Sequence, residues 1–187
     1  MTIGRSLVMA AVFVAMATLP LCSSGKEGAM SLTLQSPAFA HNAAMPDKYS
    51  CDGDGVSPPL RWSDVPSTAR SLALIVDDPD APDPAAPQRT WVHWVLYDVP
   101  PTADALAEKV SAAQLPDGTR EGLNDWKHTG YGAACPPKGR HRYVFKLYAL
   151  DRVLPDLHKP DKAQLLKAME GHVVAHAELI GTYQRGH

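Results

Sequence analysis

The fold of this chain is decided by the stretch Ser71-Leu72-Ala73-Leu74-Ile75-Val76-Asp77-Asp78-Pro79-Asp80-Ala81-Pro82. Its first half is an almost continuous apolar run, which is typical of a strand buried on both faces. Its second half holds acidic residues and prolines, and each proline fixes its own φ and restricts the residue before it. The stretch therefore predicts a central strand that leads directly into a rigid polar loop.

Two further runs predict strands of the same core. Residues 90–99 are rich in aromatic and β-branched side chains and end at Pro100 and Pro101. Residues 141–150 alternate apolar with polar or aromatic side chains after a Gly/Pro loop. We expect these three strands to form much of the core.

The remaining elements are short or lie near the ends of the domain. Residues 32–34 alternate like a strand, and residues 175–183 predict a last strand. Asp161 followed by Gln164 is a capping-box arrangement that predicts the start of one helix. With 17 prolines and long loops between strands, a mostly β sandwich or Greek-key fold is favoured over a helical or doubly wound one.

The N-terminal residues differ from the rest of the chain. Arg5 is the only charged side chain before residue 25, and residues 7–21 form an apolar run that contains Pro20. A membrane-spanning helix needs about 20 apolar residues, so this shorter run predicts a signal peptide at residues 1–24 and an exported, periplasmic or secreted protein. The residues that lead to Cys22 loosely resemble a lipobox, so lipid anchoring at Cys22 is an alternative.

The rest of the chain predicts a short tether at residues 25–30 and one domain at residues 31–187. The chain has 18 basic and 20 acidic residues and a net charge of -2. This near balance does not predict electrostatic binding to nucleic acid or to an anionic membrane. We expect recognition at a local site, and contact with a membrane only through lipidation at Cys22.

Two cysteines, Cys51 and Cys135, remain once the signal region is set aside. In an exported protein an even pair is a candidate for one disulfide. Two unpaired, partly buried thiols are the equally weighted alternative. The spacing in the sequence does not decide between them.

Three segments next to loops combine charge, histidine and proline, namely residues 77–82, 91–94 and 130–143. Proline-braced loops lose little entropy when they hold a ligand. The third segment also offers backbone amides free of large side chains, which phosphate or carboxylate recognition can use. Together these segments predict a small anion pocket.

His93 and Arg142 in these segments also have structural interpretations. A lone His93 in an apolar strand is more often a hydrogen-bonded core residue than a ligand contact. Arg142 alternates to the face opposite His141, so it is expected to serve structure by pairing with an acidic loop residue such as Asp80.

An Asp52-Gly53-Asp54-Gly55 turn lacks the spaced ligands and closing Glu of a calcium loop. We expect no metal site and no cofactor.

Several motifs, taken in order, resemble the phosphatidylethanolamine-binding protein family. They are Asp78-Pro79-Asp80-Ala81-Pro82, Trp91-Val92-His93, Pro136-Pro137-Lys138-Gly139 and His141-Arg142-Tyr143. Asn124-Asp125-Trp126 and Glu178-Leu179-Ile180-Gly181-Thr182-Tyr183 are similar to its bacterial Raf-kinase-inhibitor-like branch. The resemblance covers about residues 31–185 and implies a large antiparallel sheet packed on a smaller one, with few helices.

The resemblance also implies a set of ligand-binding residues. By motif alignment the pocket of the family falls on Asp78, Pro82, His93, Pro137, His141 and Tyr143, with Cys135 where the family often has a small residue. Two imidazoles and a tyrosine hydroxyl can donate to a phosphate-like group, and Asp78 can orient a histidine.

We therefore expect a non-catalytic ligand-binding or modulatory protein whose partner is a small anion or a phosphorylated head group. The alternative is an inhibitor of a protease or kinase met outside the cytoplasm. A hydrolase is a weaker alternative, because no Gly-x-Ser-x-Gly elbow or other nucleophile accompanies Asp78, His93 and His141.

Overall fold

The computed structural model describes residues 1–2 and 31–186. The predicted tether, Cys22 and all but the first two residues of the predicted signal peptide lie outside these residues, so export and lipidation stay predictions. Within the described ranges no helix is both long and apolar enough to cross a membrane.

The described residues form two sheets, one α-helix and two short 3-10 turns. The elements are β1 (Thr33–Gln35), β2 (Ala43–Ala44), η1 (Asp47–Tyr49), β3 (Leu60–Ser63), β4 (Ser71–Asp78), β5 (Trp91–Val99), β6 (Ala105–Leu106), η2 (Ala112–Gln114), β7 (Arg120–Glu121), β8 (His141–Leu150), α1 (Lys162–Met169) and β9 (Val173–Tyr183). The three strands, the helix and the last strand expected from the sequence are all present. The 32–34 strand is shifted by one residue.

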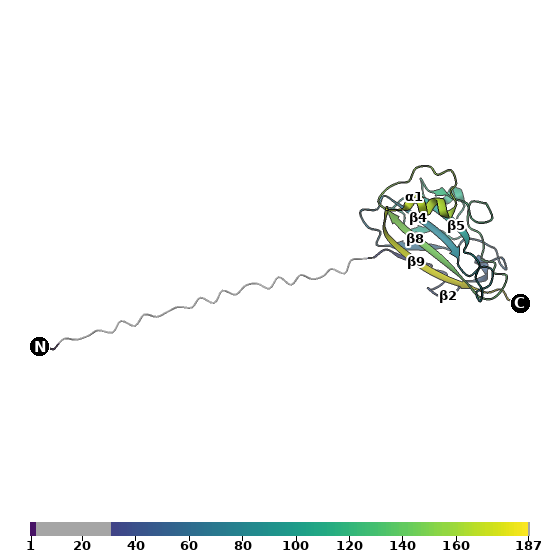
Figure 1. Cartoon of the computed structure of the whole chain (residues 1–187), viewed down its shortest axis with the longest axis horizontal. Helices are drawn as coiled ribbons and strands as arrows, with labels where there is room; N and C mark the ends of the chain where they lie inside the picture. The colour runs from purple at the N-terminus through teal and green to yellow at the C-terminus, as the bar shows by residue number, and fades with distance from the viewer. Residues whose placement is uncertain (3–30, 187) are drawn as a thin grey trace.

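The large sheet has the strand order β2-β9-β8-β4-β5-β7, and the small sheet has the order β1-β3-β6. All pairs are antiparallel except the short parallel contact between β2 and β9. Figure 1 shows the long strands β4, β5, β8 and β9 side by side, with α1 lying over them. The predicted mostly β fold, a large sheet packed on a smaller one, is confirmed.

Strand β4 is buried along its whole length because both faces of the large sheet are covered. Leu74 and Val76 belong to the core that includes Leu34 and Leu60 of the small sheet. Ala73 and Ile75, which alternate to the other face, pack with Leu165 and Met169 of α1. This double burial explains why β4 lacks the usual apolar–polar alternation.

The helix covering this second face begins at the capping box that the sequence predicts. The Asp161 side chain accepts from the Gln164 amide at 2.9 Å, and the Gln164 side chain accepts from the Asp161 amide, also at 2.9 Å. Gly171 follows the last turn with a φ of 76°, a conformation that favours glycine.

The antiparallel pairing places three strand ends at one end of the large sheet. Asp78 ends β4 and lies opposite Trp91, the first residue of β5. On the other side of β4, Asp77 pairs with Val144 near the start of β8. The three predicted pocket segments therefore meet there, although residues 130–143 are far in the sequence from the other two.

Candidate functional site

A cavity of about 230 Å³ opens at this end of the large sheet. Its lining includes six of the seven predicted ligand-binding residues, namely Asp78, Pro82, His93, Cys135, Pro137 and Tyr143. Ala81, Arg89, Trp91 and Trp126 complete it. The motifs therefore identify the walls of one cavity, with one exception.

The exception is His141, which lies behind the wall. It is fully buried, and its Nδ1 atom lies 2.6 Å from Oδ2 of Asp78 while Nε2 lies 3.0 Å from the Lys138 carbonyl oxygen. Both ring nitrogens are thus used inside the protein. The structure thus places His141 outside the lining of the cavity, and its donation to a ligand stays a prediction.

The contacts of His141 also occupy the Asp78 carboxyl group. Because the Lys138 carbonyl oxygen can only accept, His141 Nε2 donates to it, and one proton lies in the bond between Nδ1 and Oδ2 of Asp78. Asp78 also accepts the Asp80 amide through Oδ1, at 2.8 Å. Both oxygen atoms of Asp78 are therefore bonded within the protein.

His93 differs from His141 in keeping one nitrogen available. Its Nδ1 atom donates to the Gly132 carbonyl oxygen at 2.8 Å, so Nε2 is the nitrogen left for a ligand. The ring makes edge contacts with Tyr143 and Trp126, with centroids 5.1 Å apart in each case. Burial lowers the pKa of His93 below its ordinary value of 6.5.

The Tyr143 hydroxyl is a second donor that can serve a ligand. Tyr143 is 1% exposed, and its hydroxyl oxygen forms no well-aligned hydrogen bond within the described part of the chain. Burial raises the pKa of Tyr143 above its ordinary range, with a smaller contribution from the Asp78 charge, and the nearby Cys135 amide opposes the shift weakly. The hydroxyl therefore stays protonated, and a buried donor without a partner is costly.

Arg89 supplies the cationic side chain of the cavity, which the motifs did not identify. Its guanidinium lies 4.3 Å from the centroid of the Trp91 ring, a cation–π contact. Residue 89 follows the proline-rich loop, and nothing in the local pattern distinguishes it from other exposed arginines. Its proximity to the start of a predicted pocket strand is the one signal that could have suggested it.

Trp126 reaches the cavity from the loop after β7. The Asn124 side chain shapes this loop by accepting from the amides of Trp126 and His128, at 3.0 and 3.2 Å. Gly132 leaves room for the indole, because a Cβ atom there would lie 2.3 Å from the Trp126 ring. The Asn124-Asp125-Trp126 motif thus contributes to the site, a role that the sequence did not assign to it.

The predicted structural pair of Asp80 and Arg142 is present. The Arg142 side chain donates to both carboxylate oxygens of Asp80, at 2.7 and 2.9 Å, and its backbone amide donates at 2.9 Å. These bonds, first of all those from the side chain, lower the pKa of Asp80. The pair ties the loop after β4 to the first residues of β8.

The cysteines, for which the sequence left two alternatives, form a disulfide. Cys51 and Cys135 are 84 residues apart in the chain, with Cα atoms 5.3 Å apart. A backbone bridge between Ser50 and Ala134 runs alongside. Cys135 is therefore part of a cavity wall that is linked covalently to the loop after η1.

The cavity thus offers an arginine, a tyrosine hydroxyl and a histidine that can become a donor, beside the Asp78 carboxyl group, which is bonded to His141 and to the Asp80 amide. These groups suit an anion of limited size. Within residues 31–186, no three His, Cys, Asp or Glu side chains gather where they could hold a metal ion. None of the cavity-lining residues is a serine, threonine or free cysteine nucleophile.

Comparison with known proteins gives a consistent match. The model of a family described as phosphatidylethanolamine-binding protein matches residues 35–184. A UPF0098 protein of Methanothermobacter thermautotrophicus is 49% identical over 83% of this chain and 100% of its own length. A solved structure described as a putative phosphatidylethanolamine-binding protein homolog of Chlamydia trachomatis is 46% identical, with a TM-score of 0.77, over 83% of this chain and 99% of that one. YBCL of Escherichia coli, described as a new member of the mammalian family, is 29% identical with a TM-score of 0.75, over 84% of this chain and 100% of its own.

Proposed function

The chain belongs to the phosphatidylethanolamine-binding protein family, and we propose that it is a binding protein that recognises phosphate- or carboxylate-type groups in the cavity lined by Arg89, His93 and Tyr143. The family is in general one of non-enzymatic binding proteins, and the microbial relatives agree with its bacterial Raf-kinase-inhibitor-like branch. The family description names a phospholipid whose head group contains a phosphate, which is an anion of the proposed class.

The observation that carries the proposal is the Tyr143 hydroxyl. It is buried in the cavity wall and has no well-aligned hydrogen bond within residues 31–186. Leaving such a donor unsatisfied costs about 1–3 kcal/mol, and an oxygen atom of a bound anion would remove that cost. Arg89 lines the same cavity and supplies the positive charge that an anion requires.

Binding is coupled to a proton in this proposal. In neutral His93 the proton lies on Nδ1, which donates to Gly132, so Nε2 can only accept. An anion next to Nε2 favours the doubly protonated ring, in which Nε2 also donates. The affinity for an anion of constant charge should therefore rise as the pH falls toward 5.

We keep export as part of the proposal. Its sequence evidence lies almost wholly outside the described residues, and the disulfide between Cys51 and Cys135 supports it, because disulfides persist in oxidising compartments.

Inhibition of a protease or kinase outside the cytoplasm stays the alternative function. An enzyme assay with a captured partner separates the two, since only an inhibitor reduces the activity of that partner saturably.

The direct test is calorimetric titration with sulfate, whose charge is constant between about pH 5 and 8, the range in which histidine titrates, and with acetate as the carboxylate probe. We expect Arg89→Gln and Tyr143→Phe each to weaken binding by about tenfold, because hydrogen bonds to charged groups contribute about 1.5–3 kcal/mol. Arg140→Gln is the matched control, since Arg140 is exposed and does not line the cavity. Equal affinities of the wild type and all three variants, or no binding of either probe by the wild type, would exclude the proposed site.

A further inference from the structure

The disulfide between Cys51 and Cys135 lies both in the wall of the cavity and at the surface of the protein. Both cysteines are exposed, and Cys135 lines the cavity. Exposed disulfides are in general more labile than buried ones, and regulatory and catalytic disulfides are found among them. The bond between Cys51 and Cys135 is therefore accessible to a thiol that enters the cavity.

The same cavity contains the groups that attract an anion. Arg89, His93 and Tyr143 line it together with Cys135. The Tyr143 hydroxyl is buried and has no well-aligned hydrogen bond within residues 31–186, so it is available to an anionic group. Because a water molecule occupies about 30 Å³, a cavity of about 230 Å³ has room for such a group and a short chain attached to it. A molecule bound by its anionic group can therefore bring a second group to Cys135.

The charges on the two sides of the disulfide differ. On the loop side, Cys51 is followed by Asp52, whose Oδ1 atom accepts from Arg185 Nε at 3.0 Å, so an acidic and a basic group balance each other there. On the cavity side, Arg89 forms no ion pair within the part of the chain that the structure describes. An anionic reagent is therefore attracted to Cys135 more than to Cys51.

We propose that this disulfide exchanges selectively with small anionic thiols, whose anionic group binds in the cavity while their thiolate attacks Sγ of Cys135. This inference rests on the anion site proposed above. In the exchange an S–S bond forms between the reagent and Cys135, and the bond between Cys135 and Cys51 breaks. Cys51 leaves as a thiolate and then takes up a proton from water. One thiolate is consumed and one is formed, so the step needs no other oxidant or reductant.

The backbone around the disulfide keeps the two cysteines together after the exchange. The Cys51 amide donates to the Ala134 carbonyl oxygen at 2.9 Å, and the Ala134 amide donates to the Tyr49 carbonyl oxygen at 3.3 Å. The Tyr131 hydroxyl donates to the same Tyr49 oxygen at 2.9 Å. Cys51 therefore stays near Cys135, and its thiolate can attack the mixed disulfide, release the bound thiol and restore the original bond.

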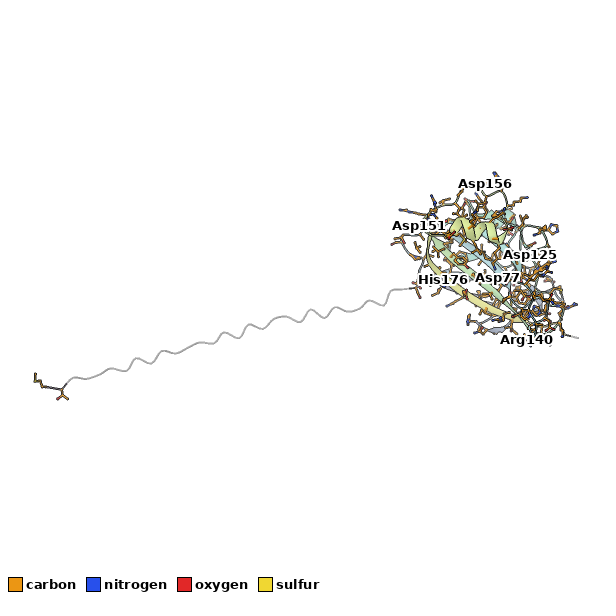
Figure 2. The ribbon with its side chains drawn as sticks, viewed as in Figure 1. Asp77, Asp125, Arg140, Asp151, Asp156 and His176 are labelled. Carbon is orange, nitrogen blue, oxygen red and sulfur yellow. A yellow bond between two sulfur atoms is a disulfide. The ribbon has the colours of Figure 1, made fainter. Side chains whose placement is uncertain are left out.

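The cavity end of the domain carries a second exposed cation that serves as a control. Figure 2 shows Asp125 and Arg140, which directly precede Trp126 and His141 in the chain, on the side of the domain away from Asp151. Arg140 is exposed and does not line the cavity. Its replacement therefore changes the charge at this end of the domain and leaves the cavity lining as it is.

The test compares the rates at which 3-mercaptopropionate and 2-mercaptoethanol modify the oxidised wild-type protein, measured by mass spectrometry after acid quenching. The reaction of each reagent with bis(2-hydroxyethyl) disulfide corrects for its thiolate fraction and its nucleophilicity. We expect a corrected rate about tenfold higher for the anionic reagent, because its carboxylate accepts charge-assisted hydrogen bonds in the cavity. Peptide mapping should find the reagent on Cys135. Equal corrected rates, or an adduct on Cys51 instead, would overturn the proposal.

Two further measurements locate the effect in the cavity. Sulfate should suppress the preference for the anionic reagent, and so should Arg89→Gln, whereas Arg140→Gln should retain it. A preference that sulfate does not reduce would show that the reagent acts from outside the cavity and would contradict the proposal. Calorimetric titration with sulfate separates this inference from the proposed function. A wild-type protein that binds sulfate but shows no preference refutes the exchange alone, and one that does not bind sulfate refutes the anion site as well.

Discussion

His141 and Asp78 form a buried pair in which Asp78 lines the cavity and His141 lies behind it. Their Nδ1 and Oδ2 atoms lie 2.6 Å apart, and their side chains are 0% and 4% exposed. The His141 Nε2 atom donates to the Lys138 carbonyl oxygen at 3.0 Å. The pair joins the end of β4 to the start of β8, and it fixes the Asp78 carboxyl group in the cavity wall.

Breaking this pair should be costly for stability. We expect His141→Phe to lower the free energy of unfolding by about 3–5 kcal/mol, because it leaves the Asp78 carboxylate buried without its partner. The double variant Asp78→Asn/His141→Phe should lose less free energy of unfolding than Asp78→Asn and His141→Phe lose in sum. Urea unfolding of the wild type, the two single variants and the double variant measures this coupling. Additive losses would show that the two side chains do not act as a pair.

The ligand-free protein should become less stable as the pH falls below about 6.5, the ordinary pKa of histidine. Burial lowers the pKa of His93 in the folded state, so the unfolded chain takes up a proton that the folded chain does not. The stability that His93 contributes is therefore full above pH 6.5 and is lost as the pH falls through the folded pKa. Urea unfolding at pH 7.5 and 5.5 should show a smaller loss for His93→Gln than for the wild type.

Sulfate binding should show the opposite dependence on pH. The affinity of the wild type should rise by up to about tenfold per pH unit while one proton is taken up with the ligand. His93→Gln should abolish most of this rise, because its amide can bond the ligand without a proton. A pH-independent sulfate affinity in the wild type would rule out protonation of His93 on binding.

Tyr143→Phe should separate stability from binding. Removing a buried hydroxyl that lacks a well-aligned bond leaves the stability of the ligand-free protein unchanged or raises it by up to about 1 kcal/mol. The protection that sulfate provides against unfolding should be reduced in the same variant. A large loss of stability without ligand would mean that the hydroxyl has a structural partner.

Reduction of the disulfide should destabilise the domain. Cys51 and Cys135 are 84 positions apart in the chain, and for a closed loop of that length the chain-entropy model gives about 4.6 kcal/mol. The melting temperature should fall in a thiol reductant and in Cys51→Ser to the same extent. Cys51→Ser should respond to the reductant no further, which controls for other effects of the reagent.

Much of the fold follows from local patterns. The apolar run of β4, the aromatic and β-branched run of β5 and the capping box of α1 each predict their element correctly. These signals are reliable because they depend on neighbours within a few residues. The pairing of Asp80 with Arg142 follows from alternation along β8 together with an acidic loop nearby.

The membership of the site could be predicted only in part. Six of the seven motif residues line the cavity, but Arg89 and Trp126 reach it from loops with no distinctive local pattern. His141 has the same residue type as His93 and lies at a comparable strand end, yet its two nitrogens are already bonded. The sequence contains no signal for that difference, because it depends on where the Asp78 carboxylate and the Lys138 carbonyl group lie.

The sequence by itself therefore determined that this chain forms a β-rich domain of this family and that three polar strand ends supply its cavity. The tertiary structure decided which of two histidines faces that cavity and that Cys51 and Cys135 are joined. The physical reason is that hydrogen-bond saturation and burial depend on groups from distant strands and loops, whose relative positions are set only when the sheets pair and pack.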